Sequence, residues 1–126
     1  MPTSETLVAK NLDSGTVVAQ RVTVAKRRVE RAVGLLTRDR LDAGDGLLIV
    51  PCRGVHTWFM RFTIDIIVLN AVGRVVDAVA GLRPWRVRFP REGSFSVLEL
   101  PEGTLLASHT EIGHRILLEK AGIQRI

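Results

Sequence analysis

The chain alternates short blocks of hydrophobic and polar residues, and most blocks have the length and composition of β-strands. Residues 5–11 and 16–24 are β-prone, and a turn-like Asp-Ser-Gly triplet separates them. We therefore predict an N-terminal hairpin over residues 5–24. By the same criteria, further strands are predicted over residues 46–52, 56–70 (one long strand or two broken ones), 74–82, 84–89, 95–100 and 114–119.

One segment changes to a helical period. From Ala25 onward, Val29, Val33 and Leu36 recur at helical spacing, and basic residues occupy the opposite side. This pattern predicts one amphipathic helix. One or two single helical turns are expected elsewhere, with residues 104–108 as one candidate.

The order of these elements predicts the fold class. Too few helical segments lie between the strands to supply the crossovers that a parallel sheet requires. We expect a single, mainly β domain over residues 1–126. Its predicted form is a compact sandwich or distorted barrel of about seven to nine short strands, with the helix covering an open end.

Composition is that of an ordinary globular domain. The 126 residues are 46% hydrophobic and 25% charged, and no window approaches the roughly 20 apolar residues of a membrane span, so no membrane partner is expected. The N-terminus lacks the features of a secretory signal. Cys52 is the single cysteine, which excludes an intramolecular disulfide and fits a reducing compartment. A cytoplasmic location is the expectation.

The charge balance raises the question of an anionic partner. The net charge is +5, and residues 83–91 interleave aromatic residues with arginines, as a platform for single-stranded nucleic acid does. In a regular strand, however, Trp85 and Phe89 would fall on the side opposite Arg86 and Arg88. We therefore predict that the aromatic side chains enter the core and the arginines face water. The candidate anion or nucleic-acid surface consists of Arg83, Arg86 and Arg88.

An acid lies inside the most apolar run of the chain. Asp65 stands between Ile64 and Ile66, where burying a carboxylate is costly unless cations or hydrogen-bond donors meet it. Arg61 shares its face in an extended chain but lies roughly 13 Å away. The partner is therefore expected elsewhere: backbone N–H groups of a turn, His56, or an arginine of segment 83–88. A structural acid that ties a loop to the barrel is favoured over a binding or catalytic acid.

Several blocks of the chain together resemble a known family. They are RAVGLLTR (31–38), GLLIVPC (46–52), HTWFMRFTIDIIVLN (56–70), GRVV (73–76), LRPWR (82–86) and VLELPEGT (97–104). In order and spacing they are similar to the bacterial and archaeal family known as domain of unknown function 192, from about Arg31 to Ile116. The resemblance implies a compact, mainly β fold and implies no reaction.

The resemblance extends to single positions. The residues that match the family's characteristic ones are Gly34, Arg38, Met60, Asp65, Gly73, Glu99, Leu100, Pro101 and Gly103. Cys52, His56 and Thr57 match a branch that has a cysteine before a His-Thr pair. Three positions depart from the pattern: Leu36 replaces a usual Met, Thr63 a usual Pro, and His114 a usual Asp.

Two further chemical arrangements are weaker. Cys52 and His56 have a spacing seen in zinc sites, but two ligands are too few, so we assign no metal and no cofactor. Glu99 could pair with Asp65 for acid-base work. Because Leu98 and Leu100 share the opposite face of the predicted strand, Glu99 is expected to point outward.

The leading hypothesis is a small non-enzymatic ligand-binding or accessory domain that takes a small ligand or a protein. Its candidate pocket consists of Cys52, His56, Trp58, Met60 and Asp65. An enzyme that uses Asp65 and His56 is the first alternative, although no catalytic residue is assigned. A basic nucleic-acid-associated protein is the second alternative. The alternation in segment 83–91 argues against it, because it places the aromatic side chains on the face opposite the arginines.

Overall fold

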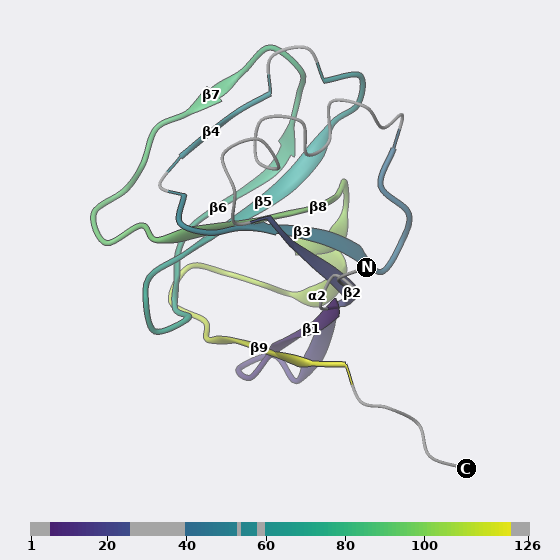
Figure 1. Cartoon of the computed structure of the whole chain (residues 1–126), viewed down its shortest axis with the longest axis vertical. Helices are drawn as coiled ribbons and strands as arrows, with labels where there is room; N and C mark the ends of the chain where they lie inside the picture. Colours follow the sequence, from purple (N-terminus) through teal and green to yellow (C-terminus); the bar gives the residue numbers. More distant parts are fainter. Residues whose placement is uncertain (1–5, 26–39, 53, 58–59, 122–126) are drawn as a thin grey trace, which may run out of the picture.

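The computed structural model describes residues 6–25, 40–52, 54–57 and 60–121 of the chain (Figure 1). The helix predicted from Ala25 onward falls on residues 26–39 and so lies outside the described residues. Within the described ranges there are nine strands and one short helix. They are β1 (Thr6–Asn11), β2 (Thr16–Ala25), β3 (Asp45–Ile49), β4 (Val55–His56), β5 (Ile64–Leu69), β6 (Val75–Leu82), β7 (Val87–Arg88), β8 (Ser96–Pro101), α2 (Thr104–Ser108) and β9 (Ile116–Lys120).

Seven strands form one curled sheet in the order β6-β5-β8-β3-β2-β1-β9. Neighbours are antiparallel except for the parallel pair β2 and β3. The edges meet at one end, where Arg74 and Arg115 form a bridge and the Ile116 N–H donates to the Gly73 carbonyl at 2.8 Å. The molecule is a half-barrel, which confirms the predicted mainly β class.

The closing turn requires a glycine. Gly73 has φ +85°, and a Cβ at this position would lie 2.8 Å from the Ile116 carbonyl oxygen. A side chain here would therefore strain the backbone and collide with β9. This contact explains why the turn between β5 and β6, which touches the start of β9, carries Gly73, one of the residues that match the family pattern.

The strands bury side chains on both faces of the central sheet. Along β5, every residue is buried: Ile67 and Leu69 pack in an inner core with α2, and Ile64, Ile66 and Val68 pack in an outer core. This two-sided burial accounts for the continuous apolar run in the sequence. The inner core joins both ends of the curled sheet through residues such as Ala9, Val22, Leu98, Leu105 and Ile116.

Local turn chemistry forms the predicted N-terminal hairpin. β1 and β2 pair antiparallel, with Asn11 opposite Thr16. The Asn11 side-chain oxygen accepts the N–H groups of Asp13 at 2.9 Å and Ser14 at 3.0 Å. An asparagine that satisfies the turn in this way favours reversal of the chain, so the predicted hairpin is confirmed.

A second, smaller layer lies beyond the main sheet. The segment 56–70, predicted as one long or two broken strands, begins at the last residue of β4 and contains β5. β4 pairs antiparallel with β7, with Val55 opposite Arg88 and His56 opposite Val87. This two-stranded ribbon lies at the end of the molecule away from β9 (Figure 1). Segment 84–89 is not the regular strand that was predicted, since only Val87 and Arg88 are in β7.

Candidate binding surface

Asp65 is a buried anchor for α2 and β6. The side chain is 0% exposed, and its Oδ1 accepts the Gly81 N–H at 2.9 Å. Its Oδ2 accepts the N–H groups of Gly103 at 3.1 Å and Leu105 at 2.9 Å. Gly103 is the N-cap of α2 and has no side chain to satisfy the first N–H groups of the helix, so Asp65 supplies that oxygen from β5.

These contacts identify the partners of Asp65. Backbone N–H groups of turns were among the predicted partners, whereas the hydrogen bonds of Asp65 to described residues include neither His56 nor an arginine. The sequence made Arg61 an unlikely partner within its own strand, and Arg61 donates none of these three hydrogen bonds. Three donors leave the carboxylate well satisfied in the interior, where a charge without donors would be costly.

The sheet separates the residues of the predicted pocket. Asp65 lies on the inner face with α2, whereas Cys52 and Met60 pack in the outer core. His56 is exposed on β4, and Trp58 lies outside the described residues. The Cys52 thiol donates to the Gly54 carbonyl at 3.0 Å. Within the described part of the chain, no group of three or more His, Cys, Asp or Glu side chains is arranged to hold a metal ion.

Thr57 fixes the turn that leads into β7. Its side chain is 0% exposed, its N–H donates to the Arg86 carbonyl at 2.8 Å, and its carbonyl accepts the Trp85 N–H at 3.0 Å. Its hydroxyl donates to the Arg83 carbonyl at 2.6 Å and accepts the Arg86 N–H at 2.9 Å. A single buried threonine thus holds both ends of the turn 83–86.

Trp85 has an unusual backbone conformation in this turn. Its φ is +63°, in the left-handed region that bulky residues rarely adopt. Such a conformation costs about 1–3 kcal/mol and persists only where the surroundings impose it. The hydrogen bonds of Thr57 provide that constraint. Despite this cost, the Trp85 side chain is 58% exposed.

Arg88 and Asp77 fasten β7 to β6. The Arg88 Nε and Nη2 donate to the two Asp77 carboxylate oxygens at 2.8 and 2.9 Å. The Asp77 side chain is 2% exposed and also accepts the Ala78 N–H at 3.0 Å. The hydrogen bonds from Arg88 hold the pKa of Asp77 below its ordinary value, although burial opposes this shift. The same pairing raises the pKa of Arg88.

For segment 83–91, we predicted that the aromatic side chains enter the core and that the arginines face water. This prediction is wrong for both aromatic side chains and for Arg88. Arg88 was expected to face water and instead reaches inward to Asp77. Because β7 is fastened through Arg88, its neighbours in the alternation point outward. Trp85, Val87 and Phe89 are 58%, 43% and 76% exposed rather than packed in the core.

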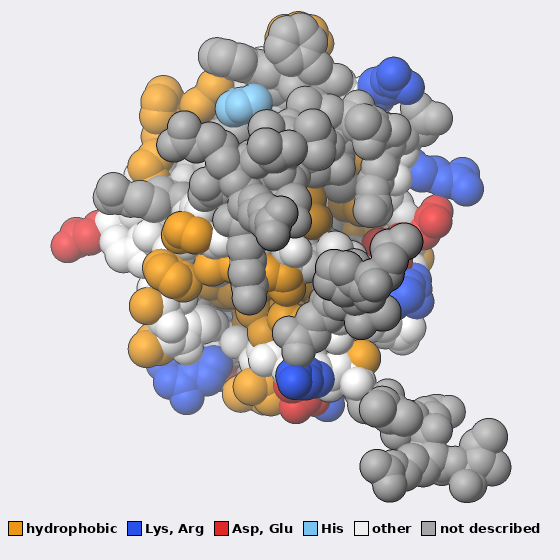
Figure 2. All heavy atoms as spheres, viewed as in Figure 1, with side chains coloured by type: hydrophobic (Ala, Val, Ile, Leu, Met, Phe, Trp, Pro, Cys, Tyr) orange, Lys and Arg blue, Asp and Glu red, His pale blue; other side chains and the backbone are white. Residues whose placement is uncertain are grey.

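The result is an exposed surface that combines apolar and basic side chains. Figure 2 shows hydrophobic side chains gathered at the surface over β7, at the upper left. An open, shallow groove of about 340 Å³ lies over the paired strands β4 and β7 and is lined by residues that include Val55, His56, Val87 and Phe89. We call this surface the ribbon face and define it by the exposed side chains of His56, Arg83, Trp85, Arg86, Val87, Phe89 and Arg91.

Glu99 is buried rather than outward-pointing, which corrects the sequence prediction. It lies on β8 opposite Leu47 on one side and Ile66 on the other, and it is 6% exposed. Glu99 lies on the face of β8 opposite Leu98 and Leu100, as the alternation predicted. Both faces of this central strand are covered, however, so the side chain is buried. Burial raises the pKa of Glu99 to about 7.

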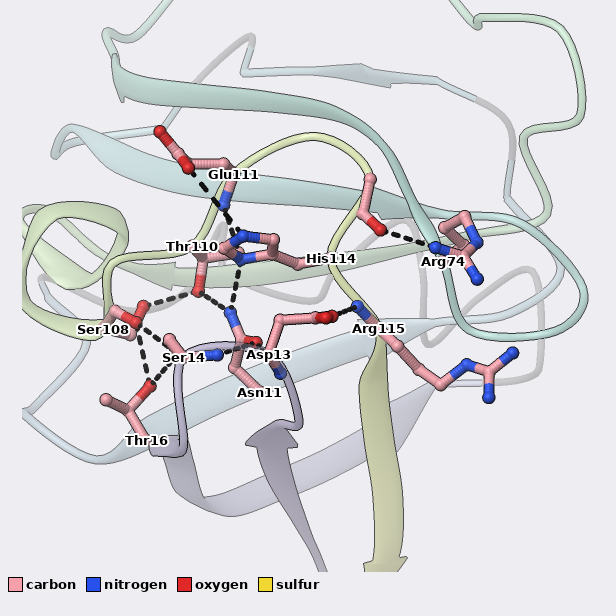
Figure 3. A network of polar contacts seen from close by, with 11 residues as sticks. Asn11, Asp13, Ser14, Thr16, Arg74, Ser108, Thr110, Glu111, His114 and Arg115 are labelled. Carbon is pink, nitrogen blue, oxygen red and sulfur yellow. Dashed lines mark hydrogen bonds and ion pairs between the residues drawn. The ribbon is translucent and has the colours of Figure 1, made fainter.

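A polar network joins the β1–β2 turn to the segment between α2 and β9 (Figure 3). The Asn11 amide is buried and donates to the Thr110 hydroxyl at 3.1 Å, and the Ser108 hydroxyl lies 2.7 Å from the same oxygen. The hydroxyls of Ser14 and Thr16 both donate to the Ser108 carbonyl, at 2.9 and 2.8 Å. The members of this network are up to 103 residues apart, so no local sequence pattern reveals it.

His114 belongs to this network as an acceptor. Its Nδ1 lies 3.0 Å from the Asn11 amide nitrogen and accepts the Glu111 N–H at 3.3 Å. An aspartate, the residue that the family pattern has here, could accept the same two donors through its carboxylate. The departure at position 114 therefore preserves a hydrogen-bond acceptor at the closed end of the half-barrel.

A family model matches most of the chain. The model of the family DUF192, described as "Uncharacterized ACR", matches residues 9–118. The chain is 32% identical over 109 residues to a UPF0127 protein of Pyrococcus furiosus, covering 84% of this chain and 93% of that protein. It is 31% identical over 111 residues to a UPF0127 protein of Thermococcus sibiricus, covering 84% and 71%.

Two solved structures share the fold. A protein of unknown function from Novosphingobium aromaticivorans superposes with a TM-score of 0.76 at 21% identity, covering 89% of this chain and 83% of that one. A Sinorhizobium meliloti protein described as a "putative transcription regulator" superposes with a TM-score of 0.79 at 22% identity, covering 96% of both chains. At these identities the likeness shows the fold alone. Among the described residues, no helix is long and apolar enough to cross a membrane.

Proposed function

We propose that this chain, which belongs to the DUF192 family, is a non-enzymatic binding module that holds an anionic partner against the ribbon face. The family membership predicted from the sequence is confirmed by the match over residues 9–118. The names of the relatives assign no reaction to the family. The proposal therefore rests on the surface of this molecule, and it includes the cytoplasmic location expected from the sequence.

The observation that carries the proposal is the exposure of three apolar side chains beside three arginines. Trp85, Val87 and Phe89 are 58%, 43% and 76% exposed within one short segment. Apolar side chains grouped on a surface mark sites where a partner covers them. Arg83, Arg86 and Arg91 are exposed in the same segment, which contains no acid between residues 83 and 91.

The charge of the ribbon face favours an anionic partner. Arginine stays protonated at any physiological pH. Asp77, the acid fastened beneath the ribbon, is paired with Arg88 and also lies 3.7 Å from the Nε of the exposed Arg91, so the surplus positive charge of the ribbon face rests on Arg83 and Arg86. Positive charge concentrated on a folded surface attracts anions and accelerates their encounter.

The ribbon face is also held in a fixed shape before any partner arrives. The turn 83–86 is held by Thr57, and β7 is fastened by the Asp77–Arg88 ion pair. A surface that is already ordered loses less conformational entropy on binding, which improves affinity. This rigidity supports a binding role rather than an incidental exposure of side chains.

The proposal retains one residue of the predicted pocket. His56 is exposed, lies opposite Val87 in the β4–β7 ribbon, and lines its groove. Cys52 and Met60 contribute to the outer core, and the carboxylate of Asp65 is engaged by three backbone N–H groups. We do not propose an enzyme built on Asp65 and His56, because that acid is committed to holding α2 and β6.

Heparin affinity chromatography tests the anionic preference. The double variant Arg83→Ala/Arg86→Ala should elute at a lower salt concentration than the wild type. Its matched control is Arg74→Ala/Arg115→Ala, which removes the same charge next to the sheet edges, away from the ribbon. Elution of the control should move much less. Equal shifts of the two double variants would show that only net charge matters and would refute the ribbon face as the site.

A further inference from the structure

We infer that the anionic partner is a single-stranded nucleic acid whose bases stack on Trp85 and Phe89. This inference rests on the proposed function and adds the class of ligand. Proteins that bind single strands combine a positive surface with exposed aromatic side chains on which bases stack. The sequence alternation had argued against such a platform by placing both aromatic side chains in the core, and their exposures of 58% and 76% remove that objection.

The aromatic side chains discriminate between classes of polyanion. An acidic peptide satisfies arginines but offers no planar group to cover an indole and a phenyl ring. In a duplex, the bases are stacked on one another and their faces are inaccessible. A single strand supplies both phosphates for the arginines and free base faces for the rings. It is therefore the polyanion whose chemistry matches both kinds of side chain.

The conformation of Trp85 is the second, independent observation. Its positive φ of 63° is imposed by the hydrogen bonds of Thr57 to the turn 83–86. Strained residues of this kind concentrate at ligand sites, where the surroundings hold a side chain in the orientation that binding requires. With no partner bound, Trp85 is 58% exposed. The strain is thus associated with presentation of the ring rather than with burial.

The arginines are placed close to the rings. The Arg86 Nη1 donates to the carbonyls of Pro84 and Trp85 at 3.4 Å, which keeps its guanidinium next to the Trp85 backbone. The Arg91 Nε lies 3.7 Å from an Asp77 oxygen and so stays near the end of β7. Phosphates on either side of a stacked base would meet a cation at both ends of the segment.

The surface beside Phe89 has room for a base. Phe89 lines the shallow groove of about 340 Å³ over β4 and β7 and also a second hollow of about 240 Å³ formed by residues 87–91. Both hollows are open to solvent on a ring that is 76% exposed. A base can therefore approach Phe89 without rearrangement of the main sheet.

Fluorescence anisotropy with labelled oligothymidylate tests the inference. The comparison ligands are a duplex of the same length and labelled polyglutamate of similar charge. We expect oligothymidylate to bind at least about tenfold more tightly than either comparison ligand, since only it offers free bases. Trp85→Ala and Phe89→Ala should each weaken that binding by about tenfold or more.

Matched variants separate stacking from general effects. Leu106→Ala removes an exposed apolar side chain, 81% exposed, from α2 and should leave the affinity unchanged. Arg83→Ala/Arg86→Ala should reduce the dependence of log affinity on log salt by about 1.4, as expected for two lost phosphate contacts on a single strand. Circular dichroism of each variant checks that the fold is intact.

Every outcome of these measurements decides the inference. Polyglutamate or anionic phosphatidylglycerol vesicles that bind to the ribbon face when oligothymidylate does not would overturn the nucleic-acid partner and leave the proposed function standing. Tight duplex binding that ignores Trp85→Ala would also overturn base stacking. Failure of all these polyanions to bind would overturn both the inference and the proposed function.

Discussion

Arg88 on β7 and Asp77 on β6 form a two-pronged ion pair, with N–O distances of 2.8 and 2.9 Å, that fastens the outer ribbon to the main sheet. Asp77 is 2% exposed, whereas the Arg88 side chain is 35% exposed. The arginine therefore covers the acid from the solvent side. This pair sets the direction of the adjacent side chains, because Val87 and Phe89 are exposed where Arg88 points inward.

Breaking this pair should destabilise the protein and loosen the ribbon. Arg88→Ala leaves the Asp77 carboxylate buried without its main partner, which is expected to lower the free energy of unfolding by about 2–3 kcal/mol, given the partial exposure of the arginine. Urea denaturation measures the loss. Arg21→Ala, which removes the Arg21–Asp45 pair at 2.7 Å with the arginine side chain 54% exposed, is the control and should cost less than about 1 kcal/mol. Equal losses would contradict the anchoring role of Arg88.

The same pair predicts sensitivity to acid. Arg88 lowers the pKa of Asp77 below the ordinary value of 3.8, so the pair stabilises the protein above that pH. Stability is lost as the pH falls through the lowered pKa, because protonation discharges the carboxylate. In Asp77→Asn this part of the acid dependence should be absent. Urea denaturation of both proteins at several pH values below 5 measures the difference, and identical profiles would refute it.

Glu99 should give a pH dependence of opposite sign. Its pKa is raised from 4.5 to about 7 in the folded protein, so the native state binds more protons than the unfolded state between these values. The free energy of unfolding should therefore fall by about 3 kcal/mol as the pH rises through this window. Glu99→Gln should abolish the fall and be more stable than the wild type above pH 7. A wild-type stability that rises from pH 4.5 to 7 would contradict this assignment.

Asp65 should behave as a structural residue. In Asp65→Asn, the amide NH₂ group faces backbone donors that the carboxylate now satisfies, so we expect a loss of about 2–4 kcal/mol in the free energy of unfolding. Asp13→Asn is the control, because the Asp13 side chain accepts one exposed N–H, from Arg115, at 2.7 Å. Folded Asp65→Asn should bind polyanions as the wild type does. A stable Asp65→Asn variant that had lost binding would instead indicate a functional acid.

Trp85 should show a trade between stability and binding. Trp85→Gly relieves the positive φ of 63°, and the ring it removes is 58% exposed, so the variant should be at least as stable as the wild type. The same variant should lose most of its affinity for oligothymidylate. Thermal denaturation and anisotropy measure the two effects. A large loss of stability would show that the Trp85 ring serves packing rather than binding.

Features that depend on local chemistry could be predicted from the sequence. The hairpin was predictable because the residues between its strands form their own turn, where Asn11 accepts two N–H groups. The helical turn at 104–108 was predicted, and the structure contains α2 there. The apolar run around Asp65 predicts a buried strand. A buried carboxylate needs hydrogen-bond donors, so such donors around Asp65 could be expected.

The orientation of the ribbon could not be predicted, because contacts distant in sequence decide it. Alternation correctly predicted that Arg88 and its neighbours lie on opposite faces of the strand. It could not predict which face is exposed to solvent. Asp77 decides that question from 11 residues away, and Thr57 fixes Trp85 across a larger separation. Glu99 shows the same limit. Both faces of β8 are covered, so its side chain is buried whichever face of the strand it is on.

The most direct test of the central claim is an amide NMR titration of the protein with oligothymidylate. Residues 54–57 and 83–91 form the two strands of the ribbon and its turn, so their signals should shift together and saturate with one affinity. The signals of β1, β9 and α2 should stay in place. Shifts that cluster on α2 or the sheet edges, with the ribbon unaffected, would contradict the account of the ribbon face as the binding surface.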